Sequence, residues 1–152
     1  VVLHALDWLE QGDGCRPDGV MLLLPTSPLR LPADIDRAIE LFYREKASSV
    51  VSVVDLGKYM TNLRFIEDHQ MIRVAPDENP NAQRQDLKKL FAVNGSIFVA
   101  CSDVLKSEGT FHVDEALPYV MDSLSSIDIN SPDDLMLARR IASALEPWTS
   151  RK

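Results

Sequence analysis

Runs of apolar residues alternate with amphipathic stretches along the chain, and this alternation predicts strands interleaved with helices. Two nearly continuous apolar runs, at residues 20–24 and 50–54, are typical of strands buried on both faces of a sheet. A third strand is expected at residues 95–101, and a fourth, shorter one at residues 126–129. This order indicates an α/β fold with a mostly parallel sheet and helices on both faces.

Three stretches space their apolar residues as an amphipathic helix does. The first covers residues 1–11, and the second runs from Pro32 to about residue 46, with proline in its first turn. The third begins after Ser131, a residue type that caps helix N-termini, and is expected to end at Pro147. Its predicted buried stripe consists of Leu135, Ala138, Ile141, Ala142 and Leu145.

Residues 55–92 depart from this alternation. Two short runs, at residues 63–67 and 71–74, flank a polar tripeptide and predict a hairpin. Residues 76–85, which follow, are polar and contain two prolines. We therefore expect this segment to form an excursion that leaves the main sheet.

Composition limits the classes of function. The 152 residues suffice for one domain with a sizeable core, so we expect a single domain over residues 1–152. A hydrophobic content of 45% is that of a soluble globular protein, and no apolar run approaches the roughly 20 residues of a membrane span. The net charge of −7 argues against nucleic-acid binding, and two cysteines without metal-ligand spacing favour a cytoplasmic location.

The loop after the first predicted strand carries candidate ligand-binding groups. Thr26 and Ser27 lie between two prolines, which fix the φ angles of the loop, and Arg30 follows at its rim. In open α/β sheets, ligands bind beyond the carboxyl ends of the strands. The loop is therefore expected to hold an anionic group.

Four segments, in order, resemble the acylneuraminate cytidylyltransferase family, which includes the CMP-sialic acid synthetases. They are residues 22–30 (LLLPTSPLR), 84–87 (RQDL), 94–98 (NGSIF) and 126–135, where SIDIN precedes DDL. The resemblance extends from about Val1 to Ala142. It implies a Rossmann-like nucleotide-diphospho-sugar transferase fold and transfer of CMP from CTP to a nonulosonic, sialic-acid-like sugar acid, with release of pyrophosphate. It also implies Mg²⁺ as a cofactor and a homodimer.

Asp128 is the carboxylate expected to hold the metal. In the predicted arrangement it ends a buried strand, where an unpaired carboxylate is costly, and the alternative is that Asp128 or Asn130 caps the next helix. The corresponding family motif is Ile-Asp-Ile-Asp, and its two aspartates are associated with Mg²⁺. Here Asn130 takes the second position, which implies weaker metal binding because an amide oxygen carries less charge.

The resemblance also assigns residues to catalysis and to substrate binding. Arg84 is the expected catalytic cation, and the expected substrate-binding residues are Thr26, Ser27, Arg30, Gln85, Asn94, Gly95 and Phe111. Each assignment has a simpler alternative. Asn94 and Gly95 form an ordinary turn in many proteins. Arg84 with Gln85 is otherwise a solvated pair, and Phe111 is equally a core residue.

The chain departs from the family pattern at two further positions, and the first of them bears on the substrate. The family often has a glutamine that touches the sugar just before Pro-Thr-Ser-Pro, whereas this chain has Leu24. An apolar side chain cannot make that hydrogen bond, which indicates a sugar acid other than the common sialic acid. Lys88 replaces a proline of the Arg-Gln motif.

Family members begin with a strand and a basic, glycine-containing loop that cradles the triphosphate, and nothing like this loop occurs in the chain. The chain therefore resembles the carboxyl-terminal two-thirds of such an enzyme. If nothing supplies the loop, CTP binding should be weak and turnover negligible. Two alternatives stay open. One is a non-catalytic remnant or binding module of the same fold, and the other is a sugar nucleotidyltransferase that uses another nucleotide or acid.

The excursion at residues 55–92 corresponds to the segment through which family members dimerise. In the family, a basic residue from this segment can enter the active site of the neighbouring subunit. Lys58, Arg64 and Arg73 are the candidates for that residue here. The alternative is a solvated hairpin with no partner.

Overall fold

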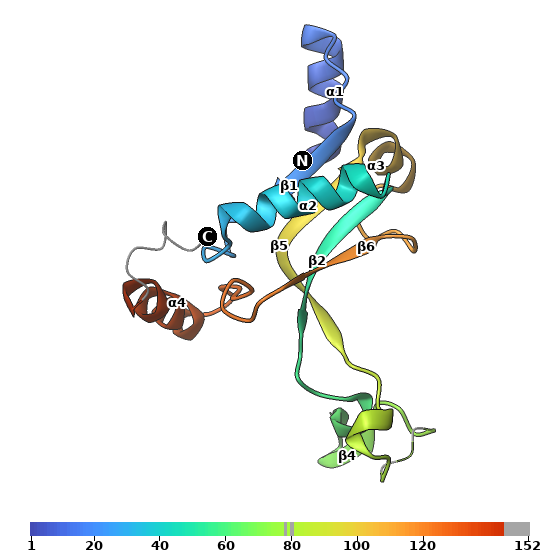
Figure 1. Cartoon of the computed structure of the whole chain (residues 1–152), viewed down its shortest axis with the longest axis vertical. Coiled ribbons are helices and arrows are strands. Elements are labelled where there is room, and N and C mark those ends of the chain that lie inside the picture. Colours follow the sequence, from blue (N-terminus) through green and yellow to red (C-terminus); the bar gives the residue numbers. More distant parts are fainter. Residues whose placement is uncertain (78, 80, 145–152) are drawn as a thin grey trace.

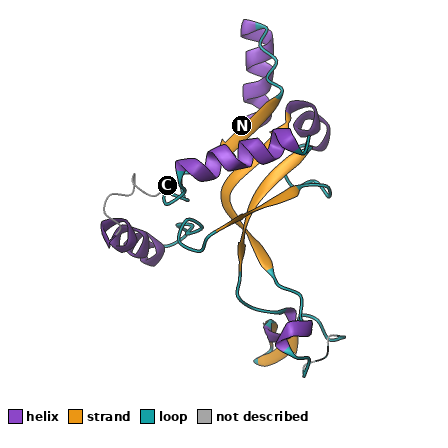
Figure 2. Ribbon diagram, in the orientation of Figure 1, coloured by secondary structure: helices purple, strands orange, loops and turns teal. Residues whose placement is uncertain are grey.

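The computed structural model describes residues 1–77, 79 and 81–144. The elements follow one another along this part of the chain as α1 (Val2–Asp13), β1 (Gly19–Leu23), α2 (Pro32–Arg44), β2 (Ser49–Asp55), η1 (Met60–Asn62), β3 (Arg64–Glu67), β4 (Gln70–Arg73), η2 (Arg84–Asp86), β5 (Phe91–Cys101), α3 (Ser102–Glu108), β6 (Leu117–Met121) and α4 (Pro132–Ala144). The α/β class is confirmed (Figure 2).

The main sheet is mixed rather than mostly parallel. Its strand order is β1-β5-β2-β6, in which β5 is antiparallel to both of its neighbours and β6 is parallel to β2. The reason lies in the excursion between β2 and β5. The chain leaves the sheet at the carboxyl end of β2 and returns at the same end, so β5 must run in the opposite direction.

Helices cover both faces of the sheet, as the sequence predicts. On one face α2 contributes Ala38 and Phe42 to a core that includes Val50 and Ile97. On the other face α1 and α3 pack beside a second core of Leu6, Val51, Phe98, Ala100, Leu105 and Phe111. Burial of apolar side chains on both faces accounts for the apolar character of the central strands.

Two elements differ from the sequence prediction near the carboxyl end of the chain. Residues 126–129 do not form a strand. They follow a turn in which the Asp122 carboxylate accepts hydrogen bonds from the main-chain N–H of Leu124 and Ser125, and such an Asx turn competes with strand pairing. The fourth strand is instead β6, which contains Pro118 and was not predicted. Proline is tolerated there because β6 is an edge strand.

Helix α4 begins at Pro132, as predicted, but its apolar stripe is mostly exposed. Of its described residues only Ala138 is buried, while Leu135 is 37% exposed. The predicted stripe residue Leu145 and the predicted stop at Pro147 lie outside the described residues. In Figure 1, α4 stands to one side of the sheet, joined to β6 by a loop.

The excursion is an extension of the central ribbon. Strands β2 and β5 continue beyond the sheet toward β3 and β4, which form a separate two-stranded sheet (Figure 1). Asp68 and His69 join the two strands, and both have positive φ angles, 48° and 65°. This is the conformation of a two-residue hairpin turn, and it confirms the predicted hairpin.

Candidate functional site at the carboxyl ends of the strands

Three segments meet beyond the carboxyl ends of β1 and β6. They are the loop at residues 25–30, the bulged start of β5, and residues 122–131 after β6. The Ile129 main-chain N–H donates to the Thr26 carbonyl oxygen at 2.8 Å, which joins the first and third segments. The sequence therefore placed Thr26 and Asp128 at one end of the sheet correctly, although Asp128 lies in a loop and not at the end of a strand.

Asp128 carries an unsatisfied buried oxygen. Its Oδ2 accepts a hydrogen bond from Asn130 Nδ2 at 2.8 Å, whereas its Oδ1 is enclosed and has no hydrogen-bond partner among the described residues. A Cβ placed on Gly95 would lie 3.9 Å from Oδ2, so the carboxylate faces the bare backbone of that glycine. A buried carboxylate oxygen without a partner costs free energy, and a cation would offset that cost.

Asn94 is placed at this site, but its side-chain amide is already engaged. Its Oδ1 accepts from Ser52 Oγ at 2.5 Å and from the Ser96 N–H at 3.1 Å. Its Nδ2 donates to Ser126 Oγ at 2.8 Å and contacts Met121 Sδ at 3.4 Å. Sequence reasoning did not single out Ser52 or Ser126, because a serine within an apolar strand or a polar loop gives no pattern of its own.

Arg30 and Ser27 occupy the floor of the loop in different ways. Arg30 Nη1 donates to the carbonyl oxygen of Ser96 at 2.5 Å and to that of Leu24 at 3.4 Å, which ties the loop to β5. Burial lowers the pKa of Arg30 from its ordinary value. Ser27 is 1% exposed, and its hydroxyl has no partner among the described residues. Ser27 is therefore the second enclosed polar group in this region without a partner.

Arg84 and Gln85 are not brought to Asp128 within one chain. Both lie on η2, in the excursion, which Figure 1 shows at the far end of the β2–β5 ribbon from the loop that precedes α4. The structure does not describe the Arg84 side chain. Gln85 is exposed, and its Nε2 donates to Gln83 Oε1 at 3.0 Å.

Phe111 and Leu24 lie on the face of the sheet that α1 and α3 cover. Phe111 is 9% exposed, and its ring centroid is 5.8 Å from that of Phe98, so it takes a core position. Leu24 packs against the same core and approaches Gly95, where its Cδ1 would lie 3.7 Å from an added Cβ. The apolar side chain that replaces the family glutamine therefore borders the Asp128 site.

A cavity of about 420 Å³ lies elsewhere. It is lined by Ser48, which precedes β2, and by residues of α3 and of the loop between α3 and β6. Its lining includes the carboxylates of Glu108, Asp114 and Glu115, which would repel an anionic substrate. We therefore place the candidate site at Asp128 and not in this cavity.

The residues at Asp128 fit a metal that is held mainly by substrate. Among the described residues, no group of three or more His, Cys, Asp or Glu side chains is arranged to hold a metal ion. Mg²⁺ commonly binds through one or two carboxylates and the phosphates of a nucleotide, and Oδ1 of Asp128, which has no partner among the described residues, could serve as one such ligand. Asn130 donates to Asp128, so in this arrangement it orients the carboxylate.

None of the described helices is long and apolar enough to cross a bilayer. No protein-family model matches the chain.

Individual relatives do match it. A CMP-N,N'-diacetyllegionaminic acid synthase from Legionella pneumophila is 30% identical over 134 residues, which are 82% of this chain and 53% of the relative. An N-acylneuraminate cytidylyltransferase from Escherichia coli O18:K1:H7 is 31% identical over 118 residues, covering 77% of this chain and 28% of the relative. The Campylobacter coli post-translational flagellin modification protein B is 26% identical over 140 residues, or 90% of the chain and 58% of the relative.

The chain thus spans about half the length of the Legionella relative and less than a third of the Escherichia one. The matched portion nevertheless covers most of this chain, 82% for the Legionella relative and 77% for the Escherichia one. The chain is a distant homologue of the CMP-sialic and CMP-legionaminic acid synthetases, the acylneuraminate cytidylyltransferase family.

Proposed function

We propose that the protein containing this chain transfers CMP from CTP to a nonulosonic, sialic-acid-like sugar acid. A hydroxyl of the sugar acid attacks the α-phosphorus of CTP, a new O–P bond forms, and the bond to the pyrophosphate leaving group breaks. The observation that carries the proposal is the enclosed Oδ1 of Asp128, which lies beside Gly95 and has no hydrogen-bond partner among the described residues. Homology to CMP-sugar acid synthetases supports the choice of reaction, and the family implies a nucleotide-diphospho-sugar transferase fold.

Positioning and charge neutralisation are the main tasks in phosphoryl-group chemistry. Mg²⁺, when bound, would neutralise charge on the triphosphate. Asp128 would contribute the protein's carboxylate ligand, and Asn130 would hold its other oxygen through the hydrogen bond at 2.8 Å. Gly95 leaves space beside that carboxylate because it has no side chain. With one carboxylate in place of the family's two aspartates, metal binding would depend strongly on the phosphates of CTP.

The sugar acid would lie on the side of Leu24. This side chain is half-buried and reaches Gly95, so it presents methyl groups where a glutamine would present an amide. A substrate with an apolar or acylated substituent at that place would avoid leaving a hydroxyl group unpaired. We therefore propose an acid that differs from the common sialic acid, as the product named for the Legionella relative does.

The nucleotide side of the site would need a segment beyond these residues. Strand β1 is at the edge of the sheet, and each of its five residues is only partly buried although four of them are apolar. An apolar edge strand with a free row of N–H and C=O groups is suited to pairing with a further strand. We propose that such a strand, with a phosphate-binding loop, completes the site.

The excursion would mediate a homodimer. Four apolar side chains on the hairpin are exposed, namely Phe65 (55%), Ile66 (79%), Met71 (76%) and Ile72 (42%). Because neighbouring strand residues point to opposite faces, both faces of the hairpin are apolar. A two-stranded hairpin is marginal by itself in water, so a second copy packed against it would explain its composition.

A dimer would also bring cations to the Asp128 site. We propose that Arg84, on η2, acts at the site of the partner subunit, because its own Asp128 lies at the far end of the ribbon (Figure 1). Of the other candidates, Arg64 donates to the carbonyl oxygens of Thr61 and Leu63, and Arg73 donates to that of Pro76. These bonds occupy part of both guanidinium groups, which favours Lys58 as a second cation.

The test is pyrophosphate release from CTP in the presence of Mg²⁺ and a pool of eight- and nine-carbon keto-sugar acids. The protein should release pyrophosphate only when a sugar acid is present, and Asp128→Ala should abolish the release. Asp133→Ala is the matched control, since Asp133 is an exposed carboxylate at the start of α4. Substrate binding without any release would instead support a non-catalytic binding module, and release with another nucleotide would support the other alternative.

A further inference from the structure

Strand β5 carries a large irregularity opposite a single serine. Val51 of β2 pairs with Phe98 of β5, but Val53 pairs with Val93. Four β5 residues, at positions 94–97, therefore face one β2 residue, Ser52. Such a bulge leaves main-chain groups without their ladder partners and redirects side chains, and bulges are common beside active sites.

Ser52 supplies the missing hydrogen bonds. Its side chain is fully buried, and its Oγ accepts the main-chain N–H of Ile97 at 2.7 Å while donating to Asn94 Oδ1 at 2.5 Å. Asn94 Oδ1 also accepts the N–H of Ser96 at 3.1 Å. One hydroxyl thus closes the bulge, and within it Gly95 adopts a φ of +71°, a conformation that favours glycine.

The network continues to the segment that carries Asp128. Asn94 Nδ2 donates to Ser126 Oγ at 2.8 Å, and Ser126 Oγ donates to the Asp122 carbonyl oxygen at 2.6 Å. Asp128 follows Ser126 by two residues. The chain of contacts therefore runs from β2, through the bulge in β5, to the loop whose carboxylate faces Gly95.

We infer that Ser52 is a positioning residue for Asp128, acting through Asn94. The expected effect of Ser52 on catalysis rests on the proposed function. Its expected effect on the segment that carries Asp128 does not. Asn94 would accordingly serve to hold the site in shape and not to touch the sugar, because both hydrogen-bonding atoms of its amide are engaged with protein atoms. A fully satisfied buried network of this kind specifies one geometry, and removing one member leaves others unpaired.

The chain offers a closely matched control. Ser49 lies on the same strand, is also fully buried, and its hydroxyl lies at hydrogen-bond distance from two main-chain oxygens, those of Val99 (3.0 Å) and Phe111 (2.7 Å). It is at the amino end of β2, away from Asp128. Ser49→Ala and Ser52→Ala both remove one buried hydroxyl from one strand, so they should lower global stability to a similar extent.

The first readout is hydrogen exchange of the Ile129 amide, which bonds the Thr26 carbonyl oxygen in the intact site. Exchange is measured by NMR on the protein as it exists, together with global stability from urea unfolding. We expect Ser52→Ala to speed Ile129 exchange by about tenfold or more relative to Ser49→Ala at equal global stability. Ser126→Ala, which breaks the network at a half-buried position, should do the same if Ser52→Ala fails to fold. Equal exchange in the Ser49 variant and in the foldable network variant would overturn the inference.

The second readout is the half-saturating Mg²⁺ concentration in CMP transfer. It should rise by about tenfold in Ser52→Ala and stay at the parental value in Ser49→Ala, since removal of groups that orient a metal ligand commonly has that effect. If Ser52→Ala still transfers CMP and its half-saturating Mg²⁺ concentration is unchanged, the inference is contradicted. If the parent shows no transfer, the proposed function fails, and Ile129 exchange alone decides the role of Ser52.

Discussion

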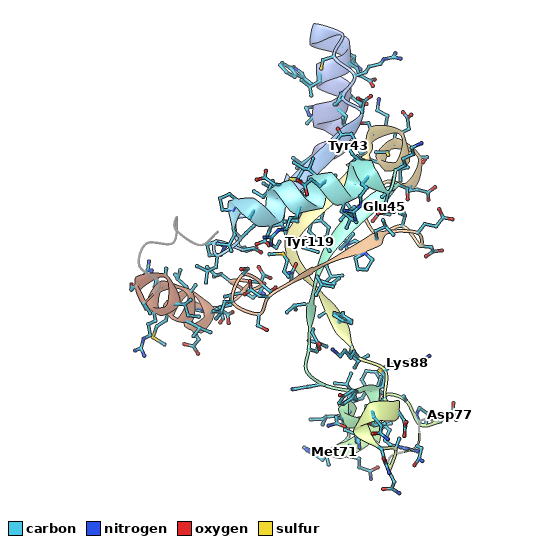
Figure 3. The ribbon with its side chains drawn as sticks, viewed as in Figure 1. Tyr43, Glu45, Met71, Asp77, Lys88 and Tyr119 are labelled. Carbon is cyan, nitrogen blue, oxygen red and sulfur yellow. The ribbon has the colours of Figure 1, made fainter. Side chains whose placement is uncertain are left out.

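The two ends of the β2–β5 ribbon differ in which side chains they bury and which they expose. At the sheet end, polar side chains are enclosed, and Ser52, Asn94 and Ser96 are buried and hydrogen-bonded. At the excursion end the reverse holds, and apolar hairpin side chains such as Met71 (76% exposed) lie open to solvent. Figure 3 shows Tyr119 on the sheet under α2, and Met71 and Lys88 at the opposite end.

The two ends would supply two different parts of the proposed site, a rigidly held carboxylate and a cation. The sheet end has the rigidity to hold one carboxylate in a fixed place, because its polar network is satisfied internally. The excursion end holds the candidate cations on a small hairpin and in the segments beside it, and the strand residues of that hairpin are mostly exposed. Under the proposed function, a carboxylate on one subunit and a cation from the other would form a complete site only when two hairpins associate.

The largest effect is expected at the sheet end. Asp128→Asn keeps the shape of the side chain and removes its charge, so CMP transfer should fall by about 10²–10³-fold, the scale seen when a preorganised charge-stabilising group is lost. Thermal unfolding should not shift downward, because the enclosed Oδ1 has no partner to lose among the described residues. Pyrophosphate release and calorimetry check the two parts. Transfer retained at more than a tenth of the parental rate would argue against Asp128 as the metal ligand.

The next effect concerns the hairpin at the excursion end. Ile66 and Met71 are opposite each other in the β3–β4 register, so Ile66→Asp with Met71→Asp places two charges on one apolar face. Sedimentation should then show a monomer where the parent is a dimer, while the unfolding temperature of the sheet stays the same. The control is Glu67→Gln at the same hairpin. A parent that is already monomeric would remove the basis for a site shared between subunits.

Two glycines sharpen the comparison because both have positive φ, +71° at Gly95 and +60° at Gly57. Replacement by alanine should cost about 1–2 kcal/mol of backbone strain at either position. Only Gly95→Ala adds a methyl group near Asp128, so only it should also reduce CMP transfer; nothing lies within 4 Å of a Cβ at Gly57. Denaturant unfolding and transfer rates measure the two effects. Equal loss of transfer in both variants would contradict a special role for the bulge.

The smallest effect is a pH dependence within the sheet body. Tyr119 donates to Asp34 Oδ1 at 2.9 Å, and burial, together with this bond, raises the pKa of Tyr119 to about 12. Because the folded pKa exceeds the unfolded value of 10.0, this stabilisation is complete below pH 10 and is lost as the pH rises toward 12. Tyr119→Phe should be less stable by about 1 kcal/mol at pH 8 and should lose less stability between pH 9 and about 12. Urea unfolding of the two proteins over the same pH range tests this. An identical change of the free energy of unfolding with pH in both proteins would refute it.

The sequence predicted the elements whose pattern is local. The apolar run at residues 20–24 and the stripe after Pro32 predicted β1 and α2 to within two residues at every boundary. Helix α3 was missed although Ser102 and Gly109 mark its ends, because it is only seven residues long. The antiparallel course of β5 was not predictable from its residues, since it follows from the point at which the excursion rejoins the sheet.

The sequence predicted only part of the candidate site. Thr26 and Asp128 lie at one end of the sheet because they follow the carboxyl ends of β1 and β6. Asn94 joins them because β5 is antiparallel, so the strand order predicted from the sequence did not indicate its place. The role of Ser52 was not predictable, because a strand of sequence SVVSVVD shows only that the serine is compatible with a strand. Its function depends on the register between β2 and β5, and register is a property of the folded sheet.

Complementation between two inactive variants tests the shared site most directly. Asp128→Asn and Arg84→Ala are each expected to lose CMP transfer in the homodimer. In a mixed dimer, one site has both defects and the other has none, so equal mixing should restore about a quarter of the parental rate. Restoration on mixing, lost again when the hairpin carries Ile66→Asp and Met71→Asp, is the result that we predict. No restoration from two variants that still form mixed dimers would show that Arg84 and Asp128 do not act together across subunits.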